Sequence, residues 1–226
     1  IRDSGFPVDG NTISQVRGYL QQTLRTNDPE VPLDAATRAV ILFALGESGG
    51  ADVSLLKNLD TQRDKLPLFA KAMLAMAFQR AGNAKAKDII ADIQNQALVD
   101  GRGTHFEEAD GTNYDSLMHT NQRTTALVLM ALLRIDPENP LTPNIVRYLL
   151  SVRQDGHWDT TQSTAYALLA FTDYLKATGE INANYTAGVE VNGEKVLEWK
   201  VSKANVLSRK EVSMALDDLK RGAENP

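Results

Sequence analysis

The sequence contains no cysteine. This absence excludes disulfide bonds, cysteine-bound zinc and a thiol nucleophile anywhere in the 226 residues. It leaves the compartment open, because a cysteine-free chain suits an oxidising periplasm as well as a reducing cytosol.

Two further absences narrow the class of protein. There is no basic excess, since 24 Lys and Arg residues stand against 29 Asp and Glu residues for a formal net charge of -5, so nucleic acid is not an expected partner. Long apolar runs are also missing: residues 72–78 and 126–133 are far shorter than the roughly 20 residues that span a bilayer. We therefore expect no membrane span.

The sequence starts at Ile1 and shows no signal or transit peptide, so we expect it to be a processed part of a longer polypeptide.

Helical periodicity dominates the first three quarters of the chain, and the expected helices are of two kinds. Amphipathic helices, with one apolar stripe, are predicted over residues 13–24, 84–98 and 143–152. Helices that are apolar on nearly all sides are predicted over residues 35–45, 68–81, 121–134 and after Trp158. Residues 124–131 and 164–170 also resemble each other, about 40 residues apart. The alternation predicts a mainly α protein, a stack of helical hairpins in two layers like an incomplete α/α toroid or tight solenoid.

Several residues are predicted to mark the helix ends. Thr12 and Gln15 fit a capping box, Asp34 fits an N-cap, and Thr142 precedes Pro143 at a favourable first helical position. Gly82 is expected just beyond the end of the helix over residues 68–81, because glycine accepts the left-handed conformation found there.

The segment around Trp158 is the most distinctive part of the sequence. Gln154, Gly156 and Trp158 are expected to form a turn, with Trp158 buried to hold it in place. Asp159 is predicted to cap the following helix, and Gln162 to reach back to the backbone N–H of Asp159. We expect this helix to be buried on more than one side, because small and apolar residues cover most of its surface. These five residues are interpreted as structural.

The pattern changes after Gly179, which divides the chain into an expected helical domain, 1–179, and a β segment, 180–226. Alternating apolar residues flank Asn192 and Gly193, which indicates a β-hairpin. A three-residue loop over residues 192–194 is predicted, because an even loop would place Leu197 and Trp199 on the wrong face. Residues 211–216 are a candidate third strand.

Few residues suggest chemistry. Glu107, Glu108, Asp110 and Asp115 form an acidic loop in which a carboxylate pair for glycoside hydrolysis is conceivable, although nothing in the spacing separates an acid from a base. A solvated surface loop is the favoured interpretation. The histidines do not have the i, i+3 or i+4 helical spacing of a metal site. They are His105, His119 and His157. We predict no catalytic, cofactor or metal-binding residue.

The sequence YLLSVRQDGHWDTTQSTAYALLA, residues 148–170, resembles the last helical hairpin of the thioester domain of alpha-2-macroglobulins, especially bacterial ones. The shared pattern is a helix, a Gly-aromatic turn after Gln or Arg, and a helix start containing Thr-Thr-Gln. Residues 121–133 resemble the inner helix of the preceding hairpin. The strands after Gly179 resemble the return of the chain into the β domain in which this helical domain is inserted.

The resemblance implies a protease trap, in which cleavage of a bait region triggers a conformational change and a Cys–Gln thioester acylates the attacking protease. This chain contains neither cysteine nor the Cys-x-Glu-Gln motif, so none of the reactive residues of the family transfers to it. The resemblance therefore implies a non-enzymatic scaffold of a bacterial protease inhibitor, periplasmic or at the cell surface. Its partners would be proteases, through the parent protein, and adjoining β domains. Two alternatives stay open: an α/α-toroid glycoside hydrolase that uses the acidic loop, and a helical-repeat interaction module.

Overall fold

The computed structural model describes residues 7–26, 32–109, 120–206, 208, 210–215 and 219. In these residues the chain is mainly helical, as predicted. The order of elements is α1 (Gly10–Arg25), α2 (Ala35–Glu47), α3 (Val53–Asp60), α4 (Leu68–Arg80), α5 (Lys85–Gln94), β1 (Leu98–Asp100), β2 (Gly103–His105), α6 (Asn121–Ile135), α7 (Thr142–Ser151), α8 (Thr161–Thr178), β3 (Asn184–Val191) and β4 (Glu194–Ser202). The chain divides into two compact units, Ile1–Tyr174 and Leu175–Pro226, with the division inside α8.

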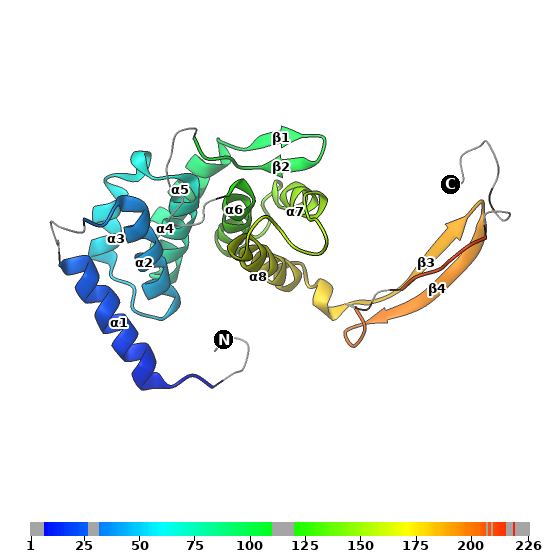
Figure 1. Cartoon of the computed structure of the whole chain (residues 1–226), viewed down its shortest axis with the longest axis horizontal. Helices are drawn as coiled ribbons and strands as arrows, with labels where there is room; N and C mark the ends of the chain where they lie inside the picture. Colours follow the sequence, from blue (N-terminus) through cyan, green and yellow to red (C-terminus); the bar gives the residue numbers. More distant parts are fainter. Residues whose placement is uncertain are drawn as a thin grey trace. The chain divides into compact units, whose positions relative to one another are not determined.

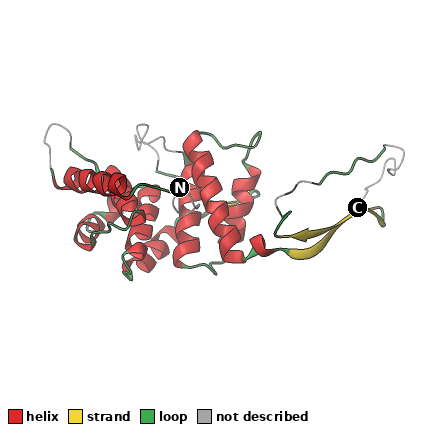
Figure 2. Ribbon diagram, turned by 90° about the horizontal axis from the view of Figure 1, so that it is seen from below, coloured by secondary structure: helices red, strands yellow, loops and turns green. Residues whose placement is uncertain are grey.

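The first unit is a stack of helical hairpins in two layers (Figures 1 and 2). Helices α2, α4 and α6 are successive neighbours, and α3 and α5 pack against them from the connecting layer. Helix α7 packs against α6 on one side and contacts the strand β2 on another. This arrangement confirms the predicted mainly α stack of hairpins.

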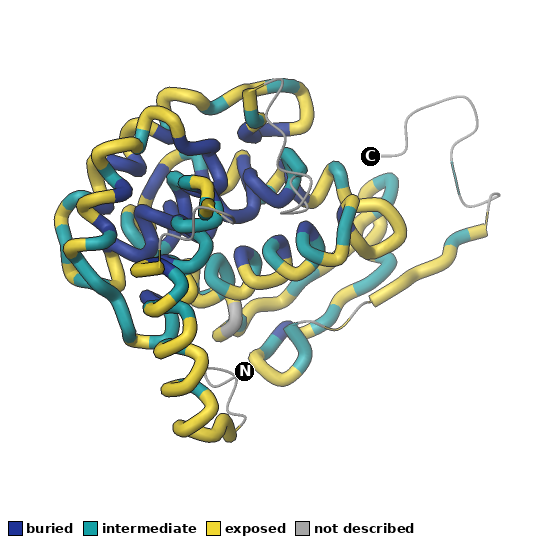
Figure 3. The backbone as a smooth tube through the Cα atoms, turned by 60° about the vertical axis from the view of Figure 1, so that its left-hand side comes forward, coloured by how far each residue is buried: buried dark blue, intermediate teal, exposed yellow. Residues whose placement is uncertain are grey.

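The core lies along α4 and α6. Residues 68–70 and 72–78 of α4 are buried, and so are residues 123–133 of α6. Figure 3 shows the buried backbone gathered inside the helical unit and the exposed backbone around it. Both helices have neighbours on several sides, so their apolar residues are removed from water all round.

The two flanking helices differ from this core. Helix α8 buries only Ser163, Ala167 and Ala170, while Leu168 and Leu169 are about half exposed. In α1 only Leu24 is buried. The prediction that α8 is buried on more than one side is therefore wrong. The composition of the helix suits burial, but the three buried residues lie along only one of its faces.

The predicted helix ends are partly correct. Asp34 caps α2 by accepting a hydrogen bond from the backbone N–H of Thr37, and Gly82 has the expected positive φ of 66° after α4. The predicted cap at Thr12 is wrong, because Asp9 caps α1 and accepts from Thr12 itself. The predicted cap at Thr142 is also wrong, since this residue is the first residue of α7.

A short β-hairpin, β1–β2, follows α5 where the sequence suggested an irregular loop. Leu98 pairs with His105, and Asp100 pairs with Gly103. Gly103 is required here for two reasons: its φ is +142°, and an added Cβ would lie 2.3 Å from the carbonyl oxygen of Asn144. The hairpin therefore packs closely against α7.

The second unit contains the β3–β4 hairpin. Tyr185, Ala187 and Val189 pair with Val201, Trp199 and Leu197, which is the predicted register. The predicted three-residue loop is nevertheless wrong, because Val191 pairs with Glu194 and leaves a two-residue loop. A register shift after Val189 inserts one extra residue in β4 and restores the alternation of faces. Residues 210–215 form no strand, contrary to the prediction for residues 211–216, and Leu216 lies outside the described residues.

No helix in the described part of the chain is both long and apolar enough to cross a membrane.

Candidate functional site

The turn between α7 and α8 is built as the sequence suggested. Gln154 and His157 exchange two backbone hydrogen bonds, of 3.0 and 2.9 Å. The two residues between them both have positive φ, 48° at Asp155 and 88° at Gly156. A two-residue loop with two left-handed residues is the type I′ geometry that Asp-Gly favours. Gln154 and Gly156 are exposed, so they contribute backbone geometry to this turn.

Trp158 follows the turn and is only 3% exposed. Its indole Nε1–H donates to the carbonyl oxygen of Leu149, at 2.9 Å, which satisfies one of the free carbonyls at the end of α7. Its backbone N–H donates to the Thr164 hydroxyl in the first turn of α8, and its ring lies 5.7 Å from that of Phe171. Trp158 thus connects the end of α7 to two points on α8.

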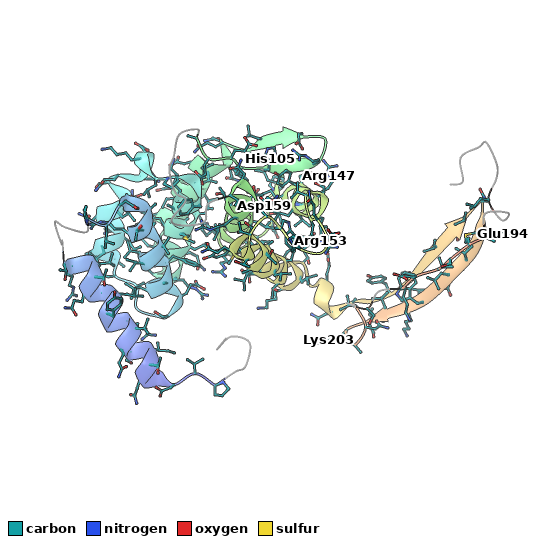
Figure 4. The ribbon with its side chains drawn as sticks, viewed as in Figure 1. His105, Arg147, Arg153, Asp159, Glu194 and Lys203 are labelled. Atoms are coloured by element: carbon teal, nitrogen blue, oxygen red, sulfur yellow. The ribbon has the colours of Figure 1, made fainter. Side chains whose placement is uncertain are left out.

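The start of α8 differs from the predicted capping box. The Thr160 hydroxyl accepts a hydrogen bond from the backbone N–H of Ser163, at 3.0 Å, so Thr160 takes the capping role predicted for Asp159. The backbone N–H of Asp159 donates to the side chain of Gln122, not to Gln162, and the Gln122 amide donates back to the Asp159 carboxylate at 2.7 Å. Asp159, which is labelled in Figure 4, therefore attaches the turn to α6 through Gln122. The sequence predicted a contact of Asp159 with Gln162 in the same helix, whereas the structure pairs Asp159 with Gln122 of α6.

A second contact joins the same ends of α6 and α8. The Thr120 hydroxyl lies 2.8 Å from the Ser163 hydroxyl, which is fully buried. Thr120 caps α6 by accepting from the backbone N–H of Arg123, as Thr160 caps α8. The two helices therefore begin alike and at the same end of the stack.

Glu108, a candidate acid of the acidic loop, has a structural position. Its carboxylate accepts hydrogen bonds from the backbone N–H groups of Leu68 and Phe69, at 2.7 and 2.9 Å, and from the Thr124 hydroxyl, at 2.9 Å. Helix α4 has Pro67 at its N-cap, which offers no side-chain cap of its own. The negative charge of Glu108 also suits the positive end of the α4 dipole. Glu108 is thus the cap of α4, supplied from a distant loop and attached to α6.

Glu107 points to a different neighbour. Its carboxylate lies 3.2 Å from Nε2 of His105, whose ring is stacked on that of Tyr148 with centroids 4.5 Å apart. The guanidinium of Arg102 lies 5.4 Å from the centre of the Tyr148 ring. Burial raises the pKa of Tyr148 above its usual value, against the lowering effect of Arg102. This group attaches the β1–β2 hairpin to α7.

Arg123 lies inside the stack between two aromatic rings. Its guanidinium is 4.7 Å from the ring centre of Phe69 on α4 and 5.7 Å from that of Tyr166 on α8. Burial lowers the pKa of Arg123, while Tyr166 and Glu108 act in the opposite direction. The cation thus links three helices through ring faces.

A chain of ion pairs connects the other end of the same helices. Arg80 of α4 donates to Glu47 of α2 at 2.8 Å. Arg134 of α6 donates both to Glu47, at 3.1 Å, and to Asp173 of α8, at 2.9 Å. Charged contacts therefore run through α4, α2, α6 and α8 without a break. The Arg134 and Asp173 side chains are 19% and 22% exposed, so this pair is partly shielded from solvent.

Of the remaining candidates, only His157 lies within the described residues. Asp110, Asp115 and His119 lie outside the described residues. Across the described ranges, no three His, Asp or Glu side chains form a group suited to a metal ion. His157 is exposed, and its Nδ1 lies 3.1 Å from the carbonyl oxygen of Trp158.

Comparison with known proteins shows a distant similarity. No protein-family model matches the chain. It is similar to an alpha-2-macroglobulin homolog of Nostoc sp. (strain PCC 7120), with 26% identity over 205 residues that cover 85% of this chain. The chain spans 10% of the length of that relative. The relationship is distant. It supports the family resemblance of the sequence at a coarse level and does not assign the thioester domain.

The geometry describes a set of structural contacts between helices. The polar residues with defined positions join helices to one another, at Trp158, Asp159, Glu108 and the ion-pair chain. Sequence analysis found Trp158 because aromatic burial beside a Gly turn is visible locally. It missed the role of Glu108, whose one signal was a helix starting at Pro67 without a capping side chain.

Proposed function

We infer that this chain is a non-enzymatic scaffold within an alpha-2-macroglobulin-like protease inhibitor. The observation that carries the proposal is the combination of the similarity to the Nostoc homolog with a helical-hairpin stack that leads into a β-hairpin. That order of elements is the one implied by the resemblance of residues 148–170 to the thioester domain.

The distribution of polar groups supports a scaffold. Glu108 binds two backbone N–H groups and a hydroxyl, and Asp159 binds Gln122, so these carboxylates stabilise helix ends. A pair of catalytic carboxyls in a glycoside hydrolase instead needs to face a shared substrate space. No contact of Glu107 or Glu108 favours that alternative. The interaction-module alternative has no specific support either.

Under this proposal, the parent protein binds the proteases. The helical unit connects the rest of the parent protein to the adjoining β domains. The parent is periplasmic or extracellular, where it meets foreign proteases. The absence of cysteine from this chain means that any thioester is supplied by another part of the parent.

The test uses the natural polypeptide that contains this chain. It is incubated with proteases of different catalytic classes, and cleavage of a large protein substrate and of a small peptide substrate is followed. A trap shields the protease from large substrates, so the first rate falls while the second persists. Undiminished cleavage of the large substrate by every protease contradicts the proposal. Hydrolysis of glycosides by the purified protein favours the alternative enzyme.

A further inference from the structure

Asn192 and Gly193 occupy the two-residue loop between β3 and β4. Their φ values are 56° and 85°, and Val191 and Glu194 pair on either side of them. Asn-Gly is the preferred sequence for such a loop because both residues accept positive φ. The same two residues also place the side-chain amide of Asn192 next to the backbone nitrogen of Gly193, and these two groups can react with each other.

We propose that Asn192 is a site of spontaneous modification, through deamidation to aspartate and isoaspartate. The backbone nitrogen of Gly193, after loss of its proton, attacks Cγ of the Asn192 side chain. A C–N bond forms, the bond from Cγ to the side-chain nitrogen breaks, and ammonia leaves. The product is a five-membered succinimide. Addition of one water molecule opens it to aspartate or isoaspartate, with no oxidant or reductant.

The surroundings of Gly193 favour the reaction. A Cβ built on Gly193 would meet no atom within 4 Å, and the residue is exposed. The attacking nitrogen therefore has no side chain on its own residue to hinder it, and the space beside the Gly193 Cα is open. Among the asparagines of the sequence, Asn192 alone precedes glycine.

Asp155 and Gly156 provide an internal comparison. They occupy a similar two-residue loop, with both residues again at positive φ. An ionised carboxylate is a poor electrophile, and its conversion to the succinimide would have to release water instead of ammonia. Asn192 is therefore expected to react first, although the two turns have similar geometry.

The modification changes the hairpin. In the isoaspartate product the main chain runs through Cβ, so the two-residue loop gains one atom and no longer matches the pairing of Val191 with Glu194. Either product adds a negative charge between Glu190 and Glu194. The modified hairpin is expected to be less stable and more acidic.

The experiment incubates the purified full chain in mildly alkaline buffer and maps each asparagine by peptide mass spectrometry over time. The expected result is a gain of one mass unit at Asn192 before any other asparagine, with an acidic species on ion exchange. The variant Asn192→Gly keeps a residue that accepts positive φ and removes the amide, so the early acidic species should be lost. The same chain under denaturing conditions serves as a control, because it gives the deamidation rate of Asn192 in the absence of the fold.

Two outcomes overturn the proposal. One is a different asparagine that reacts first in the folded chain. The other is an Asn192 that stays intact in the folded chain over the time in which the denatured chain converts fully, since the ordered turn then prevents the attack.

Discussion

Helices α6 and α8 have similar sequences and different surroundings. Both have a threonine N-cap, at Thr120 and Thr160, and counting from these caps places Leu129 of α6 at the same position as Leu169 of α8. Leu129 is fully buried, whereas Leu169 is 51% exposed. The same sequence pattern thus forms a core helix at α6 and a flanking helix at α8.

The difference shows that burial depends on the number of neighbours as well as on apolar content. Helix α6 packs against α4, α5 and α7, and side-chain contacts near both of its ends join it to α8 and to the turn before α8. The fully buried positions of α8 are the small residues Ser163, Ala167 and Ala170, whereas the larger side chains packed against the core are only partly buried. Its attachment therefore depends more on specific contacts near its ends than on apolar area.

Trp158→Ala tests the strongest of those contacts. The substitution removes a buried ring and leaves the Leu149 carbonyl without its indole donor, so a loss of about 3 to 5 kcal/mol in the free energy of unfolding is expected. Urea denaturation followed by circular dichroism measures it. A loss below about 1 kcal/mol would show that Trp158 is not a packing residue. His157→Ala, at the exposed neighbouring position, is the control.

A matched pair of leucine substitutions tests the comparison of the helices itself. Leu129→Ala creates a cavity in the core and should cost about 2 to 5 kcal/mol, whereas Leu169→Ala should cost well under half as much because its side chain is half exposed. The two variants are compared by the same denaturation. Equal losses would mean that α8 is covered in solution as fully as α6.

Gly103→Ala tests the docking of the β1–β2 hairpin on α7. A methyl group there would overlap the Asn144 carbonyl and require a residue with a side chain to adopt φ of +142°. A loss of about 2 to 4 kcal/mol is expected, since strained backbone and overpacking each cost about 1 to 3 kcal/mol. Gly101→Ala is the matched control in the same hairpin, because its Cβ would meet nothing within 4 Å. A stable Gly103→Ala variant would contradict the close packing.

Glu108→Ala tests the cap supplied to α4. The change removes the acceptor of two backbone N–H groups and should cost about 1 to 3 kcal/mol. Glu107→Ala, whose carboxylate contacts His105, should cost less than about 1 kcal/mol because the Glu107 side chain is 49% exposed and its contact is weakened by solvent. Thermal denaturation compares them. A larger effect for Glu107 would reverse the roles assigned to the two carboxylates.

The sequence was sufficient for features that depend on neighbours in the chain. Asp34 as a cap, Gly82 after α4 and the face pattern of β3–β4 are all local, and each was predicted correctly. The loop of that hairpin was predicted wrongly because a bulge at the register shift, together with the preferred Asn-Gly turn, gives the same faces as an odd loop.

Contacts between segments far apart in the chain could not be predicted from the sequence. Asp159 was expected to act within α8, yet Gln122 of α6 binds it. The ends of α4 and α6 are joined by Glu108 from a segment read as a solvated loop. Such partners depend on which helices become neighbours, and a periodic pattern along one chain does not specify this.

Amide hydrogen exchange of the intact chain, resolved by peptide, tests most directly whether α6 is a core helix and α8 a flanking one. Exchange from a native protein reports local opening, which is least frequent where apolar contacts surround a helix. The structure predicts that peptides from α4 and α6 exchange slowest and that peptides from the middle of α8, around Leu168 and Leu169, exchange clearly faster. Equal protection of α6 and α8 would contradict the account.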